Sequence, residues 1–195
     1  MDAFEAIITR RSTRNYKPLL VEEDKLEKII QAGRMAPSGG NSQSCHFFVI
    51  RDPEVIAELV RLAEAAFAKM EVSEDTYASL RNSILRSKQG GYVFCYNAPV
   101  LIVIANQKDY GNNLADTAAA IENMMIEANE LDLGSCYINQ LRWLNEERTL
   151  VDYMQSLGMK ENERVYGSVT VGYAASGLPE RTPLPRHGNE VTYIG

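Results

Sequence analysis

The sequence predicts an α+β fold in a single domain, with helices flanking a sheet of short buried strands. Segments with apolar residues at helical spacing alternate along the chain with short aromatic or β-branched runs. No internal repeat, low-complexity segment or linker divides the 195 residues. With 45% hydrophobic and 24% charged residues, the composition is that of an ordinary globular domain with one sizeable core.

In the first half of the chain, helices surround one strand. The predicted elements are helices over residues 2–10, between Glu22 and Pro37, over 54–70 and over 73–88, and a strand over Cys45–Ile50. In each helix apolar residues recur every three or four positions, whereas the strand is a run of aromatic and β-branched residues. The helix over 73–88 is the least regular and ends at Gly90 and Gly91, so we expect it to act as a mobile lid.

The second half alternates strands and helices and ends in an irregular tail. The predicted elements are strands over Pro99–Ala105, Ser135–Ile138 and Val165–Tyr173, and helices over 114–133 and from Asn145 to Leu157. Asp116 is expected to cap the longer helix and Asn145 the shorter one. The apolar stripe of the 114–133 helix is wider than one core face needs, which predicts a central position or an oligomer interface. Residues 174–195 contain three prolines and should be frayed or wrapped over something.

The charge and the cysteines exclude several classes of protein. A net charge of −6 and a pI near 5.1 provide no basic field for nucleic acid or an anionic membrane. Three widely spaced cysteines, each in an apolar or aromatic run, fit buried thiols in a reducing compartment, and no metal-binding spacing is present. Without a signal peptide or an apolar run of membrane-spanning length, we expect a cytoplasmic protein.

Two polar segments could hold a ligand. The run Arg10–Arg14 places three guanidinium groups and a hydroxyl at the end of a helix, which suits a phosphate but also suits the negative end of the helix dipole. The loop Pro37–Gln43 has glycines, amides and hydroxyls that suit a polar ring. The alternative is an ordinary connection between a helix and a strand. The two histidines, His46 and His187, suggest structural and tail positions rather than a catalytic pair. We therefore expect the chemistry to come from a planar, phosphate-bearing cofactor.

Four segments, in order, carry a family resemblance. They are Arg10–Tyr16, Ala36–Gln43 with the strand Cys45–Ile50, Ile126–Ile138, and Val169–Tyr173. Together they resemble the FMN-dependent nitroreductase family of NAD(P)H oxidoreductases. The resemblance implies a nitroreductase-like fold: a central, mostly antiparallel sheet of four or five strands flanked by helices. It also implies a homodimer of one domain over 1–195, whose extension 174–195 wraps the partner and adds Val191–Ile194 to its sheet.

The same resemblance implies which residues bind FMN. Arg10, Ser12 and Arg14 would hold the phosphate and ribityl chain, with Arg11 as an auxiliary. The remaining implied cofactor-binding residues are Pro37, Ser38, Gly39 and Asn41 from the other protomer, Asn139 and Gln140 at the N5 and O4 edge of the flavin, and one tail arginine, either Arg181 or Arg186. The resemblance assigns no residue to acid–base catalysis, since backbone amides would stabilise negative charge on the flavin.

The implied activity is transfer of a hydride from NADH or NADPH through FMN to a nitroaromatic, a quinone or a similar flat acceptor, by a ping-pong mechanism. Two alternatives stay open. The chain could be another flavin enzyme of the superfamily, such as a reductive dehalogenase, an enoate reductase or a flavin-consuming oxidase, or it could bind FMN without catalysis. The resemblance implies that region 71–97 borders the substrate side of the flavin, but the region matches no motif. Its aromatic residues could line the pocket or pack in the core: Tyr77, Tyr92, Phe94 and Tyr96.

Overall fold

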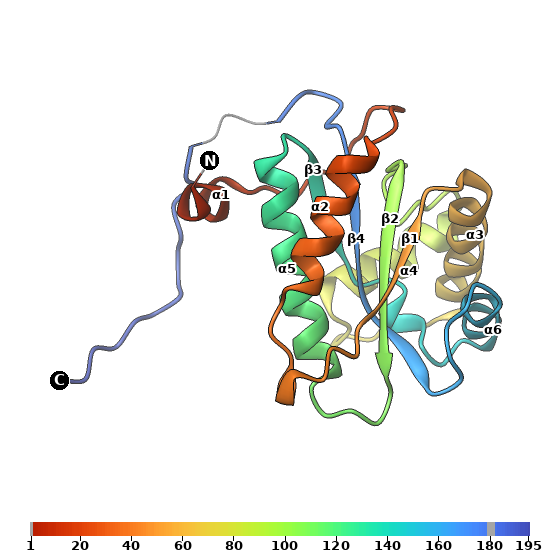
Figure 1. Ribbon diagram of the computed structural model, residues 1–195. Coiled ribbons are helices and arrows are strands. Elements are labelled where there is room, and N and C mark those ends of the chain that lie inside the picture. Colours follow the sequence, from red (N-terminus) through yellow and green to blue (C-terminus); the bar gives the residue numbers. More distant parts are fainter. Residues whose placement is uncertain (1, 179–181) are drawn as a thin grey trace.

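A computed structural model describes residues 2–178 and 182–195 (Figure 1). The described residues form an α+β fold with six α-helices and one four-stranded sheet, as predicted. The helices are α1 (Ala3–Thr9), α2 (Glu23–Arg34), α3 (Pro53–Lys69), α4 (Ala78–Gln89), α5 (Asn113–Glu130) and α6 (Arg148–Ser156). The strands are β1 (His46–Ile50), β2 (Val100–Gln107), β3 (Gly134–Ile138) and β4 (Glu163–Gly172), and the 3₁₀ turns are η1 (Gly39–Asn41) and η2 (Arg142–Leu144).

The sheet separates two hydrophobic clusters. Its strand order is β1-β2-β4-β3, and all neighbouring strands are antiparallel. Because side chains alternate along a strand, β2 supplies Leu101, Val103 and Ala105 to one cluster and Val100, Ile102 and Ile104 to the other. The first cluster also contains residues of α3, α4 and α6, and the second those of α2 and α5, which lie on the opposite side of the sheet (Figure 1). Helix α5 is central, as its wide apolar stripe predicted.

Two predicted helix caps are wrong. Asn112 occupies the cap position of α5, and Asp116 lies inside the first turn, where it is buried and serves another contact. Helix α6 begins at Arg148, after Glu147, so Asn145 does not cap it and is instead the C-terminal cap of η2. The Asn145 side chain accepts from the Val165 N–H at 3.0 Å and donates to the Val165 carbonyl at 2.7 Å. An asparagine amide carries both a donor and an acceptor, so it can pair with a strand as another strand would.

The segment after α1 is held against the end of the sheet. Ser12 forms a bridge with Ser135 of β3, and the Thr13 N–H donates to the Ser135 carbonyl at 2.8 Å. Tyr16 forms a second bridge, with Ala174 after β4. Gly134 makes this approach possible, because a Cβ there would lie 2.4 Å from the Thr13 hydroxyl. The basic run is therefore fixed beside β3.

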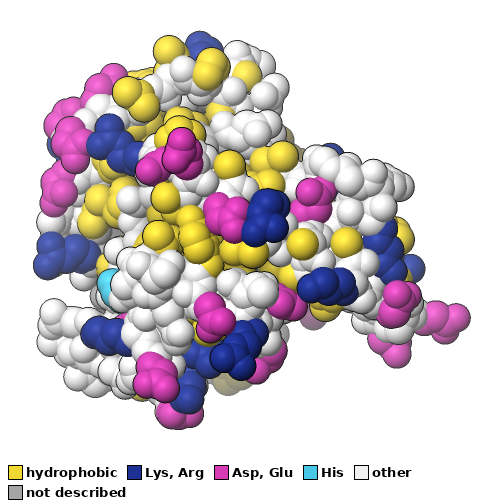
Figure 2. Space-filling view, turned by 90° about the vertical axis from the view of Figure 1, so that its right-hand side faces the viewer, with side chains coloured by type: hydrophobic (Ala, Val, Ile, Leu, Met, Phe, Trp, Pro, Cys, Tyr) yellow, Lys and Arg dark blue, Asp and Glu magenta, His cyan; other side chains and the backbone are white. Residues whose placement is uncertain are grey.

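Several apolar side chains remain on the surface. Phe4 and Ile7 of α1 are 71% and 49% exposed, and Val191–Ile194 is apolar and exposed in a tail that runs away from the body (Figure 1). Figure 2 faces the side of α3 and α6, where hydrophobic side chains reach the surface among charged ones. An apolar groove of about 500 Å³ lies between the 18–20 segment, α3 and the 93–99 segment. None of the described helices is long and apolar enough to cross a bilayer.

Candidate functional site

The basic run converges on a buried thiol of β3. Burial raises the pKa of the Cys136 thiol, while Arg14, a hydrogen bond with Ser12 and the charge of Arg10 oppose that rise. The Arg10 Nη1 atom is buried and has no hydrogen-bond partner in the described structure, and its Nε lies 3.9 Å from the Glu122 carboxylate. A buried guanidinium nitrogen without an acceptor is costly, so this position suits an anionic ligand.

A cavity of about 500 Å³ opens next to Arg14. One wall comes from α4, with Ser79, Asn82 and Arg86, and the opposite wall from the end of β3 and the loop after it. The lining residues of the second wall are Cys136, Tyr137, Asn139, Gln140 and Trp143, and Tyr92 and Tyr96 complete the site. Two guanidinium groups and four aromatic rings line the cavity, and its described lining contains no carboxylate. These walls suit a planar ligand with negative charge.

The aromatic residues of region 71–97 divide between the cavity and other places. Tyr92 and Tyr96 line the cavity, and the pKa of Tyr96 is raised by its burial against an opposing interaction with Arg14. Phe94 is fully buried in the core, so its expected alternative, core packing, is the correct one. Tyr77 is 65% exposed and packs edge-on against Trp143, with ring centroids 6.1 Å apart. Helix α4 thus forms a cavity wall, at the place where the sequence predicted a lid.

Pro37, Ser38 and Gln43 of the loop line a second, smaller cavity of about 250 Å³. Asp116 anchors the loop: its two carboxylate oxygens accept from the Gly39 N–H at 3.2 and 3.3 Å. The Tyr110 hydroxyl lies 2.9 Å from the same carboxylate and 3.0 Å from the Gly39 carbonyl. A Cβ at Gly39 would come within 2.1 Å of Asn112, and Asn41 adopts a left-handed conformation with φ of 55°. The hydrogen bonds of Gly39 with Asp116 and Tyr110 therefore hold the loop in one conformation.

Within one chain, the two groups of predicted cofactor residues approach α5 at different positions along the helix. Asp116 holds the Gly39 loop at the beginning of the helix, and Asn129 near its end donates to the Ala6 carbonyl and to Thr9 of α1. Asn129 follows Asp116 by 13 positions, about 20 Å along the helix, and Glu122, which lies 3.9 Å from the Arg10 guanidinium, follows Asp116 by about 9 Å. Arg14, Asn139 and Gln140 line one cavity, and Arg10 and Ser12 lie beside Arg14 at Cys136, whereas none of Pro37, Ser38, Gly39 and Asn41 lines that cavity.

The remaining predicted arginines differ in what the structure shows of them. The Arg11 guanidinium donates to the carbonyls of Ile8, Arg10 and Thr182, which matches a cation at the end of a helix. Arg186 is exposed in the irregular tail. Arg181 lies outside the described residues.

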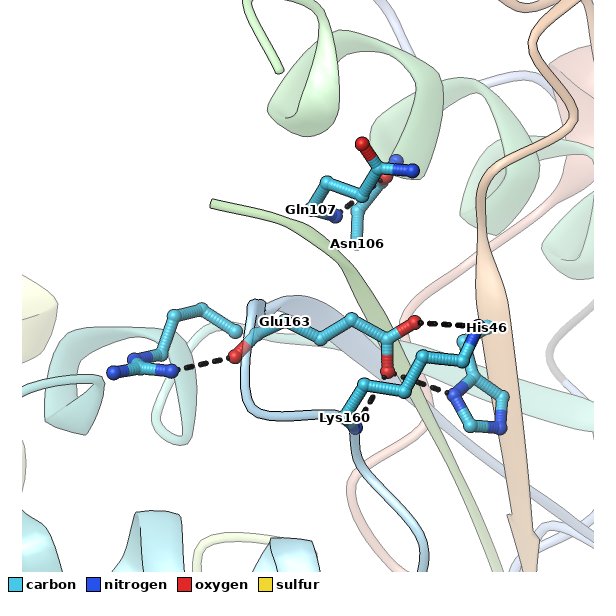
Figure 3. A network of polar contacts seen from close by, with 6 residues as sticks. His46, Asn106, Gln107, Lys160 and Glu163 are labelled. Carbon is cyan, nitrogen blue, oxygen red and sulfur yellow. Dashed lines mark hydrogen bonds and ion pairs between the residues drawn. The ribbon is translucent and has the colours of Figure 1, made fainter. Parts of the chain in front are cut away.

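His46 has a structural partner, as the sequence suggested. Its Nδ1 lies 2.9 Å from Glu163, a buried carboxylate that also accepts from the Lys160 N–H at 2.9 Å (Figure 3). None of these residues lines the cavity at Arg14. No group of three or more potential metal ligands occurs among the residues that the structure describes.

Sequence reasoning missed the residues of α4, and it misassigned Asp116. Asn82 and Arg86 are four residues apart and so share a helix face, a spacing that is visible in the sequence but not specific to a site. Trp143 is the single tryptophan of the chain, and no motif marked it. Asp116 contacts a loop 77 residues away, and a local pattern does not report such a contact.

Comparison with known proteins places the chain in a family. The sequence pattern of the nitroreductase family matches residues 7–173 of this chain. The chain belongs to the nitroreductase family. A nitroreductase with bound FMN from Bacteroides fragilis is 34% identical, and the two structures cover 100% of each other with a TM-score of 0.87. The nitroreductase fold predicted from the resemblance is confirmed.

Two relatives are also similar in sequence to this chain over most of its length. One, from Archaeoglobus fulgidus, carries the name of an NADH dehydrogenase/NAD(P)H nitroreductase. It is 30% identical over 173 residues, which cover 88% of this chain and 85% of the relative. The other is the FMN reductase (NADPH) of Bacillus subtilis, 24% identical over 98% of this chain and 74% of its own length. Both names describe redox enzymes that use a nicotinamide donor.

Proposed function

We propose that this nitroreductase-family enzyme binds FMN in the cavity beside Arg14 and transfers electrons from NADH or NADPH to a small flat acceptor. The observation that carries this proposal is the cluster at β3, where Arg10 keeps a buried donor without a partner beside Ser12 and Arg14. FMN has a phosphate for such a cluster and a planar ring for the aromatic walls. The FMN in the Bacteroides fragilis relative supports the same choice of cofactor.

Each residue of the cavity has a role that its chemistry suits. Arg10, Ser12 and Arg14 bind the phosphate and the ribityl chain by charge-assisted hydrogen bonds, which are the stronger kind. Asn139 and Gln140 present the backbone near the polar edge of the ring, where an N–H donor stabilises negative charge. When bound, FMN supplies the hydride chemistry that no side chain can supply. The cavity walls position the ring and exclude water from one side of it.

The separation of the loop from the cavity supports a homodimer in which the partner completes the site. None of the loop residues Pro37, Ser38, Gly39 and Asn41 lines the cavity beside Arg14 of its own chain, so they serve the FMN of the other protomer. The exposed Phe4 and Ile7 provide an apolar surface for that contact. The domain spans 1–195, and the extension 174–195 wraps the partner. Its Val191–Ile194 adds a strand there, and Arg181 or Arg186 approaches the phosphate.

The acceptor is a nitroaromatic, a quinone or another flat molecule, because the donor and the acceptor must each lie against the same ring. This requirement gives ping-pong kinetics: the oxidised nicotinamide leaves before the acceptor enters. Parallel lines in a double-reciprocal analysis at several NADPH concentrations are the expected result, and intersecting lines contradict the shared site.

Visible spectroscopy tests the cofactor directly. The purified chain should be yellow or should take up added FMN, and NADH or NADPH without oxygen should bleach the flavin absorbance. A colourless protein that takes up no FMN refutes the proposal. An FMN-loaded protein that neither nicotinamide bleaches would be a flavin-binding protein without this activity.

Arg14→Ala tests the assignment of the phosphate. Loss of one charge-assisted contact weakens FMN binding by about 10- to 100-fold. Arg148→Ala is the control, because the Arg148 side chain is 91% exposed on α6 and does not line the cavity. Equal FMN affinity in the two variants would contradict the role of Arg14.

A further inference from the structure

A buried chain of hydrogen bonds connects the two walls of the cavity. The Gln140 Nε2 atom lies 3.0 Å from the Tyr92 hydroxyl and 3.4 Å from the Ser83 Oγ of α4. The Tyr92 and Ser83 hydroxyls are 2.8 Å apart. Gln140, Tyr92 and Ser83 are 8%, 4% and 0% exposed, respectively, so water does not compete for their polar atoms.

The direction of each of these hydrogen bonds follows from the bond that Ser83 makes to Ser79. The Ser83 hydroxyl donates to the Ser79 carbonyl at 3.1 Å, so it accepts from Tyr92. Tyr92 gives its single proton to Ser83 and accepts one from Gln140 Nε2. The amide of Gln140 is thereby oriented, and its Oε1 accepts from the Asn139 N–H at 3.1 Å. The side chain of Gln140 thus acts on the backbone beside it.

The ring of Tyr92 is placed independently of its hydroxyl. Its ring packs edge-on against Phe67, with centroids 6.4 Å apart, and the Arg86 guanidinium lies 5.5 Å above it. The Tyr92 N–H donates to Glu64 of α3 at 2.7 Å. Tyr92→Phe therefore keeps these contacts and removes only the connection to Ser83 and Gln140.

We infer that the Tyr92 hydroxyl is a positioning group, which sets the Asn139–Gln140 backbone relative to α4. The Tyr92 ring lines the cavity, but its hydroxyl is directed to Ser83 and Gln140 and acts on the site through them. Helix α4 packs mainly against α3, so this hydrogen-bond chain is its polar link to the wall after β3. The inference rests on the proposed function, because the oriented backbone matters only if it faces the ring of FMN. Because the Asn139 N–H donates to the Gln140 side chain, the Gln140 N–H is the donor for the ring, and its displacement would stabilise the reduced ring less and lower its midpoint potential.

The test compares Tyr92→Phe with Ser87→Ala. Ser87 lies one turn beyond Ser83, is 5% exposed, and its hydroxyl has no hydrogen-bond partner in the described structure. FMN affinity is measured by titrating the apoprotein, and the midpoint potential by anaerobic reductive titration. We expect about a tenfold rise in the FMN dissociation constant and a lower potential for Tyr92→Phe, and wild-type values for Ser87→Ala.

A second variant keeps the inference falsifiable if Tyr92→Phe folds poorly. Ser83→Ala removes the acceptor of the Tyr92 proton and should shift affinity and potential in the same direction, with the double variant no worse than the more affected single one. Wild-type affinity and potential in Tyr92→Phe or Ser83→Ala overturn the inference while the proposed function stands. A wild-type protein that binds no FMN overturns both.

Discussion

Asp116→Ala should loosen the Gly39 loop and destabilise the protein. The carboxylate is 6% exposed and accepts from Gly39 at 3.2 and 3.3 Å, with the Tyr110 hydroxyl 2.9 Å away. Alanine removes the acceptor from both donors. A hydrogen bond to a charged group contributes about 1.5–3 kcal/mol. Since Tyr110 can still donate to the Gly39 carbonyl at 3.0 Å, we expect a loss of about 2 kcal/mol in the free energy of unfolding.

The same change should reach FMN if the loop serves the partner's site. A loop that has lost its anchor must be ordered on binding, and this cost weakens FMN binding by about tenfold. Asp116→Asn retains one acceptor oxygen and should show less than half of either effect. Urea unfolding measures the free energy, and titration of the apoprotein with FMN measures the affinity.

The control is Asp109→Ala, which removes an exposed carboxylate from the turn before α5. We expect it to change the free energy of unfolding by less than about 0.5 kcal/mol. If Asp116→Ala and Asp109→Ala unfold at the same urea concentration with the same slope, the anchoring role of Asp116 is refuted. If stability falls but FMN affinity does not, the loop is anchored as described and the assignment of the loop to the FMN site is wrong.

Three further predictions concern the fold. Gly134→Ala places a Cβ 2.4 Å from the Thr13 hydroxyl and should cost about 1–3 kcal/mol in thermal or urea unfolding, whereas unchanged stability would contradict the close approach. Burial opposes ionisation of Glu163, but the hydrogen bonds from His46 and the Lys160 N–H and the charges of these two residues together outweigh it and lower the pKa. Its stabilisation is complete above pH 4.5, the ordinary pKa, and is lost as the pH falls through the lowered value, so Glu163→Gln should flatten the acid limb of stability against pH. Asn145→Ala leaves the backbone of β4 without two hydrogen bonds and should cost about 1–3 kcal/mol, measured by urea unfolding with the exposed Glu146→Ala as control.

The periodic elements could be predicted because their signals are local. The continuous apolar run of β2 is buried on both faces by the two clusters, and each predicted helix with a clear apolar stripe is present. The weakest prediction, the helix over 73–88, begins five residues late at Ala78, since the preceding segment is polar and exposed. Local spacing therefore predicts whether an element is buried more reliably than it predicts the residue at which the element begins.

The candidate site was predicted in part because two of its segments carry short motifs. The Arg10–Arg14 run is recognisable from neighbouring residues, and Asn139 and Gln140 directly follow the Ile126–Ile138 motif; the fold brings Arg14, Asn139 and Gln140 to one cavity. Asn82 and Arg86 carry no such signal, because polar residues on a helix face are usually solvated.

The sequence by itself determined the kinds of element, the burial of the β2 strand and the family motifs, because burial and backbone chemistry repeat at short spacing. Only the tertiary structure decided how distant polar groups pair: Asp116 with Gly39, Asn145 with Val165, and Gln140 with Tyr92. The residues of these pairs are 77, 20 and 48 positions apart. Hydrogen bonds need directions and distances that packing alone establishes, so no pattern along the chain specifies them.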